Sequence, residues 1–147
     1  MTNFFIKKEY HHPKIFILDA KKKMLGRLAT KASLLLTGKY LTLHTPGSNQ
    51  GNFVLILNSN QIEISGKKFF LKTYYKPTNR PGNLKFSTFK TKHLNSPTYA
   101  LRTAINGMLP KNTLRKQYLK RLYIYSNLDL INKKDLNLSS LEAIWLN

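Results

Sequence analysis

The sequence predicts an α/β protein: a central, parallel-type sheet with helices on both faces (an α/β/α sandwich) and an added, extended basic loop. Two short runs, at residues 15–18 and 53–57, are wholly apolar, which is typical of strands that are buried on both sides. A helical repeat of apolar residues lies between them, and two further helical repeats precede a third strand-like run at residues 123–125. Because neighbouring parallel strands need a crossover connection, usually a helix, this alternation favours a parallel sheet.

A single domain accounts for the length of the chain. Of the 147 residues, 41% are hydrophobic, which is enough to build a core. We place this domain at residues 15–125, between an N-terminal extension at 1–14 and a polar C-terminal tail at 126–147, with a short helix at 141–146. The chain contains no Cys, which excludes disulfides, thiolate metal sites and thiol catalysis. No apolar run approaches the roughly 18 residues of a membrane span.

The first half of the domain is predicted to alternate between strands and a helix. A strand at 15–18 leads into a helix that Gly38 ends, because glycine readily adopts the left-handed conformation found there. A further strand is predicted at Tyr40 to His44, a turn-rich loop follows it, and the apolar strand at 53–57 comes next. Ile62 and Ile64 alternate with polar residues, as in a half-exposed strand, which Gly66 ends. The apolar stripe of the helix consists of Leu25, Leu28, Ala29, Ala32, Leu35 and Leu36.

The second half is predicted to begin with an extended basic arm or loop at 67–92, where Pro and Gly interrupt regular structure. Ser96 and Pro97 are the residue types of a helix N-cap and first helical position. Gly107 is expected to close this helix, and a second helix follows Pro110. The side chains expected to face the core from these two helices are Ala100, Leu101, Ala104, Ile105, Met108, Leu114, Tyr118 and Leu122.

Positive charge is the most unusual property of the composition. The chain has 25 Lys and Arg residues against 6 Asp and Glu, a formal net charge of +19. Between residues 21 and 128 there are 20 of these bases but a single acid, Glu63. Such an excess repels itself in a compact domain, and a polyanion, nucleic acid above all, would neutralise it. An anionic membrane is the rival partner, but it favours a basic helix with a wide exposed apolar face, and the core accounts for the apolar stripes here.

Two segments have the composition of an RNA-binding surface. Residues 67–89 interleave basic side chains, which neutralise phosphates, with aromatic ones, which stack on unpaired bases or sugars. The helix after Pro110 carries five bases and no acid, whereas solvated helices mix both signs to form ion pairs. A solvated loop with its aromatic residues folded beneath it is the alternative for the first segment, and Tyr74 and Tyr75 fit either role. The predicted RNA contacts are Lys67, Lys68, Lys72, Tyr74, Tyr75, Lys76, Arg80, Lys85, Lys111, Arg115, Lys116 and Lys120.

Other chemistries find little support. Residues 37–39 (TGK) and 65–67 (SGK) resemble the end of a phosphate-binding loop, but both lack its earlier Gly and the following Ser or Thr. Four His residues without Cys, among few carboxylates, leave a metal site short of ligands. A nuclease, the enzyme alternative, needs acids that cluster, and the acids here are far apart in sequence. We therefore expect no catalysis, cofactor, metal or small-molecule substrate.

Several blocks of the chain, in order and with conserved spacing, resemble one known family, the universal large-subunit ribosomal protein thirteen or L-thirteen family. Together they extend over residues 15–125, and the last of them is the most specific. The blocks are residues 25–29 (LGRLA), 36–39 (LTGK), 45–46 (TP), 65–68 (SGKK), 72–75 (KTYY), 80–85 (RPGNLK) and 107–112 (GMLPKN).

The resemblance implies an α/β/α fold that binds the large ribosomal RNA early in subunit assembly. Members bind mostly by shape and phosphate contact, beside other large-subunit proteins, which would be the partners of this chain. Arg27 and Lys39, which lie in matching blocks, join the predicted RNA contacts. The residues expected to set turns and helix ends are Gly26, Gly38, Gly107 and Pro110.

The chain departs from the family pattern at three places. Residues 49–52 (NQGN) stand where the family usually has Asp, and Lys76–Pro77 stand where it has His. The bacterial His-Pro-His signature after the last strand is missing. In lacking this signature, and in residues 114–117 (LRKQ), the chain resembles mitochondrial members more than plastid or bacterial ones. We therefore expect the ribosome of an organelle, a mitochondrion before a plastid, with the bacterial cytoplasm as the alternative.

Overall fold

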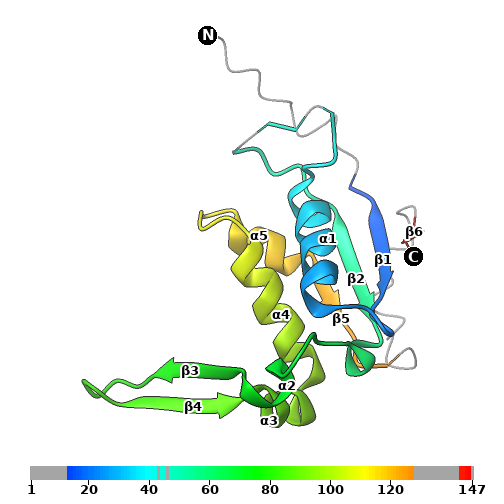
Figure 1. Ribbon diagram of the computed structural model, residues 1–147. Helices are drawn as coiled ribbons and strands as arrows, with labels where there is room; N and C mark the ends of the chain where they lie inside the picture. Colours follow the sequence, from blue (N-terminus) through cyan, green and yellow to red (C-terminus); the bar gives the residue numbers. More distant parts are fainter. Residues whose placement is uncertain (1–12, 43, 46, 128–142, 147) are drawn as a thin grey trace.

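The structure, a computed structural model, describes residues 13–42, 44–45, 47–127 and 143–146. Its centre is a four-stranded, fully parallel sheet with the strand order β5–β2–β1–β6. The α/β class and the parallel sheet that the sequence predicts are therefore confirmed (Figure 1). The strands are β1 (Ile15–Asp19), β2 (Phe53–Leu57), β5 (Leu122–Ile124) and β6 (Ala143–Leu146).

Helices and a β-hairpin complete the described part of the chain. The longest helix, α1, connects β1 to β2 and packs against α4, while α5 leads into β5. None of these helices, within the residues described, is long and apolar enough to cross a membrane. The elements are α1 (Leu25–Thr37), η2 (Ser59–Gln61), α2 (Lys68–Leu71), β3 (Thr73–Pro77), β4 (Leu84–Thr88), α3 (Phe89–Asn95), α4 (Pro97–Met108) and α5 (Arg115–Lys120).

Strand side chains alternate between the two faces of the sheet and form two apolar clusters. In the larger cluster, Phe16 and Ile56 pack with Leu36 of α1 and Leu101 of α4. Helices are expected on both faces, but among the described residues helical side chains belong to this cluster alone. The smaller cluster on the opposite face consists of Ile15, Ile17, Leu55 and Leu57, with Phe53, Tyr123 and Tyr125 packed against it.

Helix α1 ends as the sequence predicts. Its apolar stripe is buried except for the half-buried Leu25, and Gly38 follows the helix in the left-handed conformation with φ 72°. The N–H groups of Gly38 and Lys39 donate to the carbonyl oxygens of Leu35 and Leu34, both at 3.2 Å, and satisfy the end of the helix. Glycine is needed here for a second reason, because a Cβ would lie 2.6 Å from the carbonyl oxygen of Gln50.

Asn52 joins this helix end to the first strand. Its side-chain oxygen accepts the N–H of Lys14 at 3.0 Å. Its amide nitrogen donates to the carbonyl oxygen of Leu35 at 3.3 Å and to the hydroxyl of Tyr40 at 2.9 Å. The side chain itself is almost wholly buried, and its three bonds connect residues from three separate segments of the chain.

Asn52→Ala is expected to lower the free energy of unfolding by about 1–3 kcal/mol, because it removes the three hydrogen bonds by which a buried side chain joins the end of α1 to the first strand. Urea unfolding monitored by circular dichroism would measure the change. The exposed Asn95 supplies the control, since Asn95→Ala should stay within about 0.5 kcal/mol of the wild type. Equal stabilities of the two variants would show that the Asn52 hydrogen bonds are dispensable.

The strand predicted at residues 40–44 is wrong. Within this segment the chain turns twice: the N–H of Leu41 donates to Gly38 at 3.0 Å, and that of His44 donates to Leu41 at 3.2 Å. These local bonds occupy backbone groups that a strand would use for pairing. Leu43 lies outside the described residues.

The half-exposed strand predicted around Ile62 and Ile64 is reduced to one isolated parallel bridge between Met24 and Glu63. The N–H of Leu25 donates to the carbonyl oxygen of Glu63 at 2.9 Å. The segment therefore holds the start of α1 and does not extend the sheet.

The C-terminal tail contributes an edge strand. A short helix is expected at 141–146, but residues 143–146 form β6, and residues 141–142 lie outside the described part. β6 pairs in parallel with β1, so that Ile144 lies beside Phe16 and Trp145 beside Ile17. Pairing with the free edge of β1 outweighs the local helical pattern, as tertiary context often does. The sheet thus extends beyond the domain boundary that the sequence predicts at residue 125.

Helix α4 begins as predicted and ends one residue later than predicted. Ser96 holds the N-cap position and Pro97 opens the helix, although the Ser96 hydroxyl makes no capping bond. Gly107 lies inside the last turn and does not close the helix, because the N–H of Leu109 continues the pattern by bonding to Ile105 at 3.0 Å. Leu109 is buried, and Met108, predicted to face the core, is 45% exposed.

The extended loop predicted at residues 67–92 is an ordered β-hairpin between two short helices. β3 and β4 pair antiparallel over five residues each, and the turn between them contains Gly82 in a left-handed conformation with φ 74°. The β-branched and aromatic residues of both strands favour this pairing. The Pro and Gly residues that suggested irregular structure lie at the end of β3 and in the turn.

Candidate nucleic-acid interface

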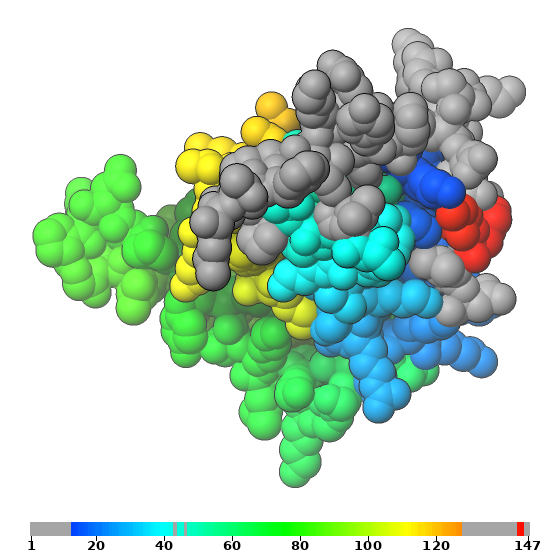
Figure 2. All heavy atoms as spheres, turned by 90° about the horizontal axis from the view of Figure 1, so that it is seen from above, coloured from blue at the N-terminus to red at the C-terminus, as the bar shows by residue number. Residues whose placement is uncertain are grey.

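The hairpin stands out from the body of the protein, as Figures 1 and 2 show from two directions. Its register places Tyr75 opposite Phe86 and Lys76 opposite Lys85. Because successive side chains of a strand point to opposite faces, the hairpin has an aromatic face and a basic face. Arg80 lies in the exposed turn between the strands.

The two adjacent tyrosines, which the sequence leaves undecided between packing and stacking, have different environments. The ring of Tyr74 packs edge-on against Tyr99 at 5.6 Å and lies 6.3 Å from the ring of Phe89. Burial, with a smaller contribution from Tyr99, raises the pKa of the Tyr74 phenol above its ordinary value. Tyr75 points away from these rings and is 66% exposed. Tyr74 is thus a packing residue, and Tyr75 is available to a partner.

An aromatic cluster anchors the hairpin to the body. Phe89, at the start of α3, is 1% exposed and stacks on His93 with a centroid distance of 5.4 Å. It also contacts Phe69 of α2 at 5.7 Å. Its N–H donates to the carbonyl oxygen of Lys72 at 2.7 Å, and the Thr88 hydroxyl caps α3. These contacts hold both strands of the hairpin at their base.

A cavity of about 500 Å³ opens beside the base of the hairpin. Its lining brings together Arg27 from α1 with Lys68 and Lys72 from the segment around α2, although these residues are about 40 positions apart in sequence. The start of α1 also lines it, and the first turn of that helix contains no acid. Basic side chains beside the positive end of a helix favour phosphate. The structure thereby assembles three of the predicted RNA contacts into one site.

A second, smaller cavity of about 230 Å³ shows basic residues that the sequence-based prediction omits. Lys22, Lys23 and Lys31 line it together with Arg27. The run of three lysines at residues 21–23 is visible in the sequence, directly before the first helix. Lys90 is also missing from the prediction, and it lies 5.7 Å from the exposed ring of Phe70.

Asp19, the acid beside these lysines, is held by its own bonds. It accepts the N–H of Lys21 at 3.0 Å and the side-chain amide of Asn58 at 2.9 Å. Desolvation raises the pKa of this carboxyl, but these hydrogen bonds and the charges of Lys21 and Lys23 together lower it below its ordinary value. Asp19 therefore stays ionised near neutral pH and offsets only part of the local positive charge.

Helix α5 presents a separate group of bases. Lys116 and Lys120 of this helix are exposed, and so is Lys111 in the loop that precedes it. Arg115 is half-buried and donates to the carbonyl oxygens of Pro110 at 3.0 Å and Leu109 at 3.2 Å. It therefore ties the loop before α5 to the helix, a structural role that the sequence does not reveal.

Arg121 is likewise a structural base. Its guanidinium donates to the carbonyl oxygen of Gly51 and lies 5.8 Å from the ring of Phe53. Burial lowers the pKa of Arg121 from its ordinary value, although nearby Tyr118 opposes the shift.

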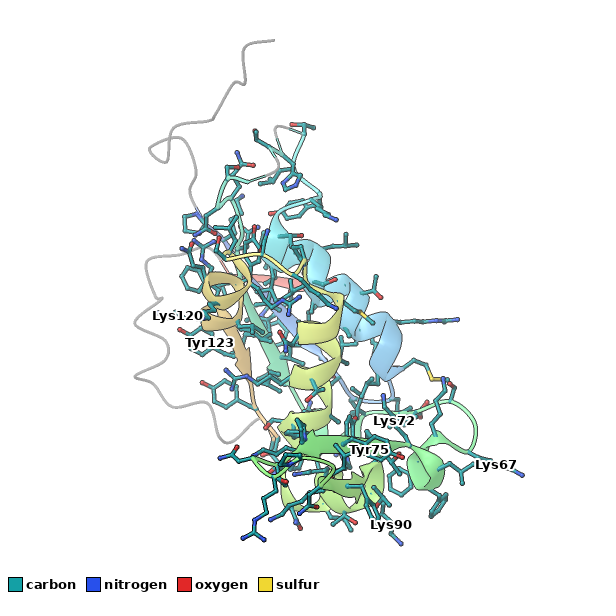
Figure 3. All side chains as sticks on the ribbon, turned by 90° about the vertical axis from the view of Figure 1, so that its left-hand side faces the viewer. Lys67, Lys72, Tyr75, Lys90, Lys120 and Tyr123 are labelled. Atoms are coloured by element: carbon teal, nitrogen blue, oxygen red, sulfur yellow. The ribbon has the colours of Figure 1, made fainter. Side chains whose placement is uncertain are left out.

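The remaining predicted contacts lie on the surface in two regions. Figure 3 shows Lys67, Lys72, Tyr75 and Lys90 at the end of the molecule that carries the hairpin, while Lys120 lies beside β5. Lys39, directly after Gly38, is exposed at the far end of α1. In the described part of the chain, Asp19 and Glu63 are the only acids, and no group of three or more His, Asp or Glu side chains could hold a metal ion.

The fold and this surface define a strongly basic α/β protein whose cationic side is suited to a polyanion. The family model of ribosomal protein L13 matches residues 13–130. The chain belongs to the ribosomal protein L13 family, and it is a ribosomal protein of the large subunit, not an enzyme.

Individual relatives agree with this family. The large ribosomal subunit protein uL13 of Maridesulfovibrio salexigens is 42% identical over 126 residues, which cover 86% of this chain and 89% of the relative. That of Borrelia hermsii is 38% identical over 139 residues, 95% of this chain and 93% of the relative. That of Prochlorococcus marinus is 40% identical over 114 residues, 78% and 80% of the two chains. All three organisms are bacteria, so these relatives do not support the organellar location expected from the sequence.

Proposed function

We propose that this protein binds the large-subunit ribosomal RNA as a structural component, beside neighbouring large-subunit proteins, and helps the subunit to assemble early. The observation that carries the proposal is the uncompensated charge: 21 Lys and Arg residues accompany two acids in the described part of the chain. The cations on such a surface repel one another, and a bound polyanion stabilises the domain because it neutralises them. Membership of a ribosomal protein family makes ribosomal RNA the natural polyanion.

Three surfaces would share the contact. The cavity beside α1 would take phosphates through Arg27, Lys68 and Lys72, and the exposed Lys67 directly precedes Lys68 in the chain. The hairpin and α5 would extend the contact to either side. The residues proposed on the hairpin are Tyr75, Lys76, Arg80 and Lys85, with Tyr74 supporting it from beneath. Those proposed on α5 and the loop before it are Lys111, Lys116 and Lys120, with Arg115 bound to that loop.

We further propose that the ribosome is of the bacterial type. The named relatives are bacterial, and two of them are aligned over more than 85% of this chain. This supports the bacterial alternative over the mitochondrion. The RNA with which the protein sediments would identify the compartment.

Sedimentation tests the proposal. The tagged protein is followed through a sucrose gradient of its native lysate, with and without ribonuclease. We expect it to comigrate with the large subunit at about one copy per large RNA, and to leave that fraction after ribonuclease. A protein that stays at the top of both gradients would contradict the ribosomal function.

Neutralising the exposed lysines of α5 and of the loop before it is expected to weaken RNA binding and to reduce its salt dependence. Each lost phosphate contact lowers the slope of log K against log salt by about 0.7–0.9, so Lys111→Gln, Lys116→Gln and Lys120→Gln together should lower it by about 2–3. Filter binding to large-subunit RNA at several salt concentrations measures the slope. The triple Lys→Arg variant keeps the charge and should keep the slope. An unchanged slope in the Gln variant would remove α5 from the interface.

A further inference from the structure

The outward face of the hairpin is aromatic and uncovered. Tyr75 and Phe86 lie directly opposite each other across the two strands and are 66% and 73% exposed. Leu84, paired with Pro77 at the next position on the same face, is also exposed. In the described part of the chain no ring contact joins either Tyr75 or Phe86 to another aromatic side chain. Large apolar side chains grouped on a projecting element mark a binding surface.

The opposite face of the same hairpin is suited to an anion. Lys76 and Lys85 are directly opposite each other, an arrangement of like charges that destabilises a strand pair unless a counter-charge lies between them. Arg80 adds a third cation at the tip. No acid occurs between residues 64 and 127, so among the described residues neither the hairpin nor the elements that follow it carry a counter-charge for these cations.

Charge complementarity decides which partner fits both faces. An apolar protein surface would cover Tyr75 and Phe86 but would leave the cations on the opposite face without a counter-charge. A nucleic acid brings flat apolar rings and phosphates on one chain. In an RNA duplex the bases are stacked on one another and their faces are inaccessible, whereas unpaired bases stack on aromatic side chains.

The anchor makes the hairpin a prepared surface. Tyr74, Phe89 and Tyr99 hold its base from the side of the body, so Tyr75 and Phe86 are presented on a paired, ordered element. A binding surface that is already ordered loses little conformational freedom when its partner binds.

We propose that the aromatic face of the hairpin, Tyr75 and Phe86 with Leu84, binds unpaired RNA bases by stacking, while Lys76 and Lys85 on the basic face hold the phosphates of the same strand. This inference rests on the proposed RNA-binding function and specifies the kind of RNA at one of its surfaces. A loop of single-stranded RNA would pass around the ribbon, with bases on one face and backbone on the other.

The test compares a single-stranded oligoribonucleotide that carries one 2-aminopurine with a perfect RNA duplex. For the full-length protein we expect quenching of 2-aminopurine fluorescence by the single strand, because stacking quenches this base. The double variant Tyr75→Ala/Phe86→Ala should lose the quenching and about tenfold or more in single-strand affinity. Its salt slope and its affinity for the duplex should be unchanged, since no charge is removed.

Matched variants separate stacking from other effects. Tyr75→Phe/Phe86→Tyr keeps two rings and should keep both the quenching and the affinity. Lys76→Gln/Lys85→Gln should lower the salt slope by about 1–2. It should not reproduce the combination expected of the double Ala variant, which is lost quenching with an unchanged salt slope. Leu94→Ala removes an exposed apolar side chain from α3 and should change neither reading. If the double Ala variant shows no thermal unfolding transition and therefore is not folded, the single variant Phe86→Ser is tested in its place.

Each contrary result has a distinct meaning. A wild-type protein that binds RNA with a steep salt dependence but does not quench 2-aminopurine would overturn the stacking inference and leave the proposed function intact. Equal losses of single-strand and duplex affinity would also overturn it. A variant with normal RNA affinity that no longer sediments with large subunits would assign the face to a protein partner instead. A wild-type protein that binds neither RNA would contradict the proposed function itself.

Discussion

Gly51→Ala is expected to lower the free energy of unfolding by at least about 3 kcal/mol, beyond the usual effect of an overpacked site. Gly51 is buried where the loop before β2 passes the end of α1. A Cβ at this position would collide with the carbonyl oxygen of Leu36 and would lie 3.2 Å from Nη1 of Arg121. The obstacle is helix backbone, which cannot rotate away as a side chain can.

The collision would also disturb the bonds around it. The loop that must move carries Asn52, whose side chain bonds to Leu35, and the carbonyl oxygen of Gly51 itself accepts the Arg121 guanidinium. A thermal melt should show a transition lower by about 10 °C for a chain of this length. Gly26→Ala is the control, because nothing lies within 4 Å of a Cβ there and alanine favours the helix. A Gly51→Ala variant as stable as Gly26→Ala would contradict the close backbone contact.

The second large effect is expected at the base of the hairpin. Phe89→Ala should lower the free energy of unfolding by about 3–5 kcal/mol, the range for removal of a fully buried phenylalanine. Its ring is the centre of the anchor, with Phe69, Tyr74 and His93 around it. Loss of this ring would leave the hairpin without its main contact with the body. The hairpin would then be only marginally stable, as isolated two-stranded hairpins are.

Phe89→Ala is therefore expected to affect RNA binding as well as stability. Hydrogen exchange should show β3 and β4 losing protection together, and affinity for large-subunit RNA should fall even at temperatures where the sheet is intact. Phe70→Ala is the matched control, since Phe70 is two-thirds exposed on α2 and its removal should change stability by less than about 0.5 kcal/mol. Loss of protection confined to α3 would show that the hairpin is anchored elsewhere.

Much of the central fold follows from patterns that are local in sequence. The apolar runs became β1 and β2, and the helical stripe of α1 is buried as predicted. Gly38 is recognisable because a helix end that needs a left-handed residue selects glycine. The excess of positive charge is a property of composition and needs no structure to be seen.

The failures of prediction share a cause, which is competition for backbone hydrogen bonds. Residues 40–44 have the composition of a strand but close local turns, and residues 143–146 have the pattern of a short helix but pair with the free edge of β1. The hairpin was taken for a loop because its Pro and Gly residues were read as interruptions, whereas they form its turn and the end of β3. In each case the secondary structure of the segment depends on whether a partner strand lies close enough to pair with it.

The candidate site likewise combines features that the sequence shows with features that only the tertiary structure sets. The sequence shows which residues are basic but not their environments: Lys116 is exposed, while Arg115 beside it is bound to the carbonyl oxygens of Leu109 and Pro110. Tyr74 and Tyr75 are chemically identical neighbours, and only strand alternation places one in the anchor and the other outside.

By itself, then, the sequence determined the α/β class, the buried strands, the long helix with its glycine end, and the large excess of positive charge, because periodicity, left-handed glycine and net charge are properties of short segments or of composition. The tertiary structure decided the edge strand β6, the cavity that gathers Arg27 with Lys68 and Lys72, the exposed aromatic face of the hairpin, and the need for glycine at Gly51. Each of these depends on the distance between atoms of residues that are far apart in the chain, or on which side of a strand is covered. Pairing, packing and steric exclusion set those distances only when the whole domain is folded.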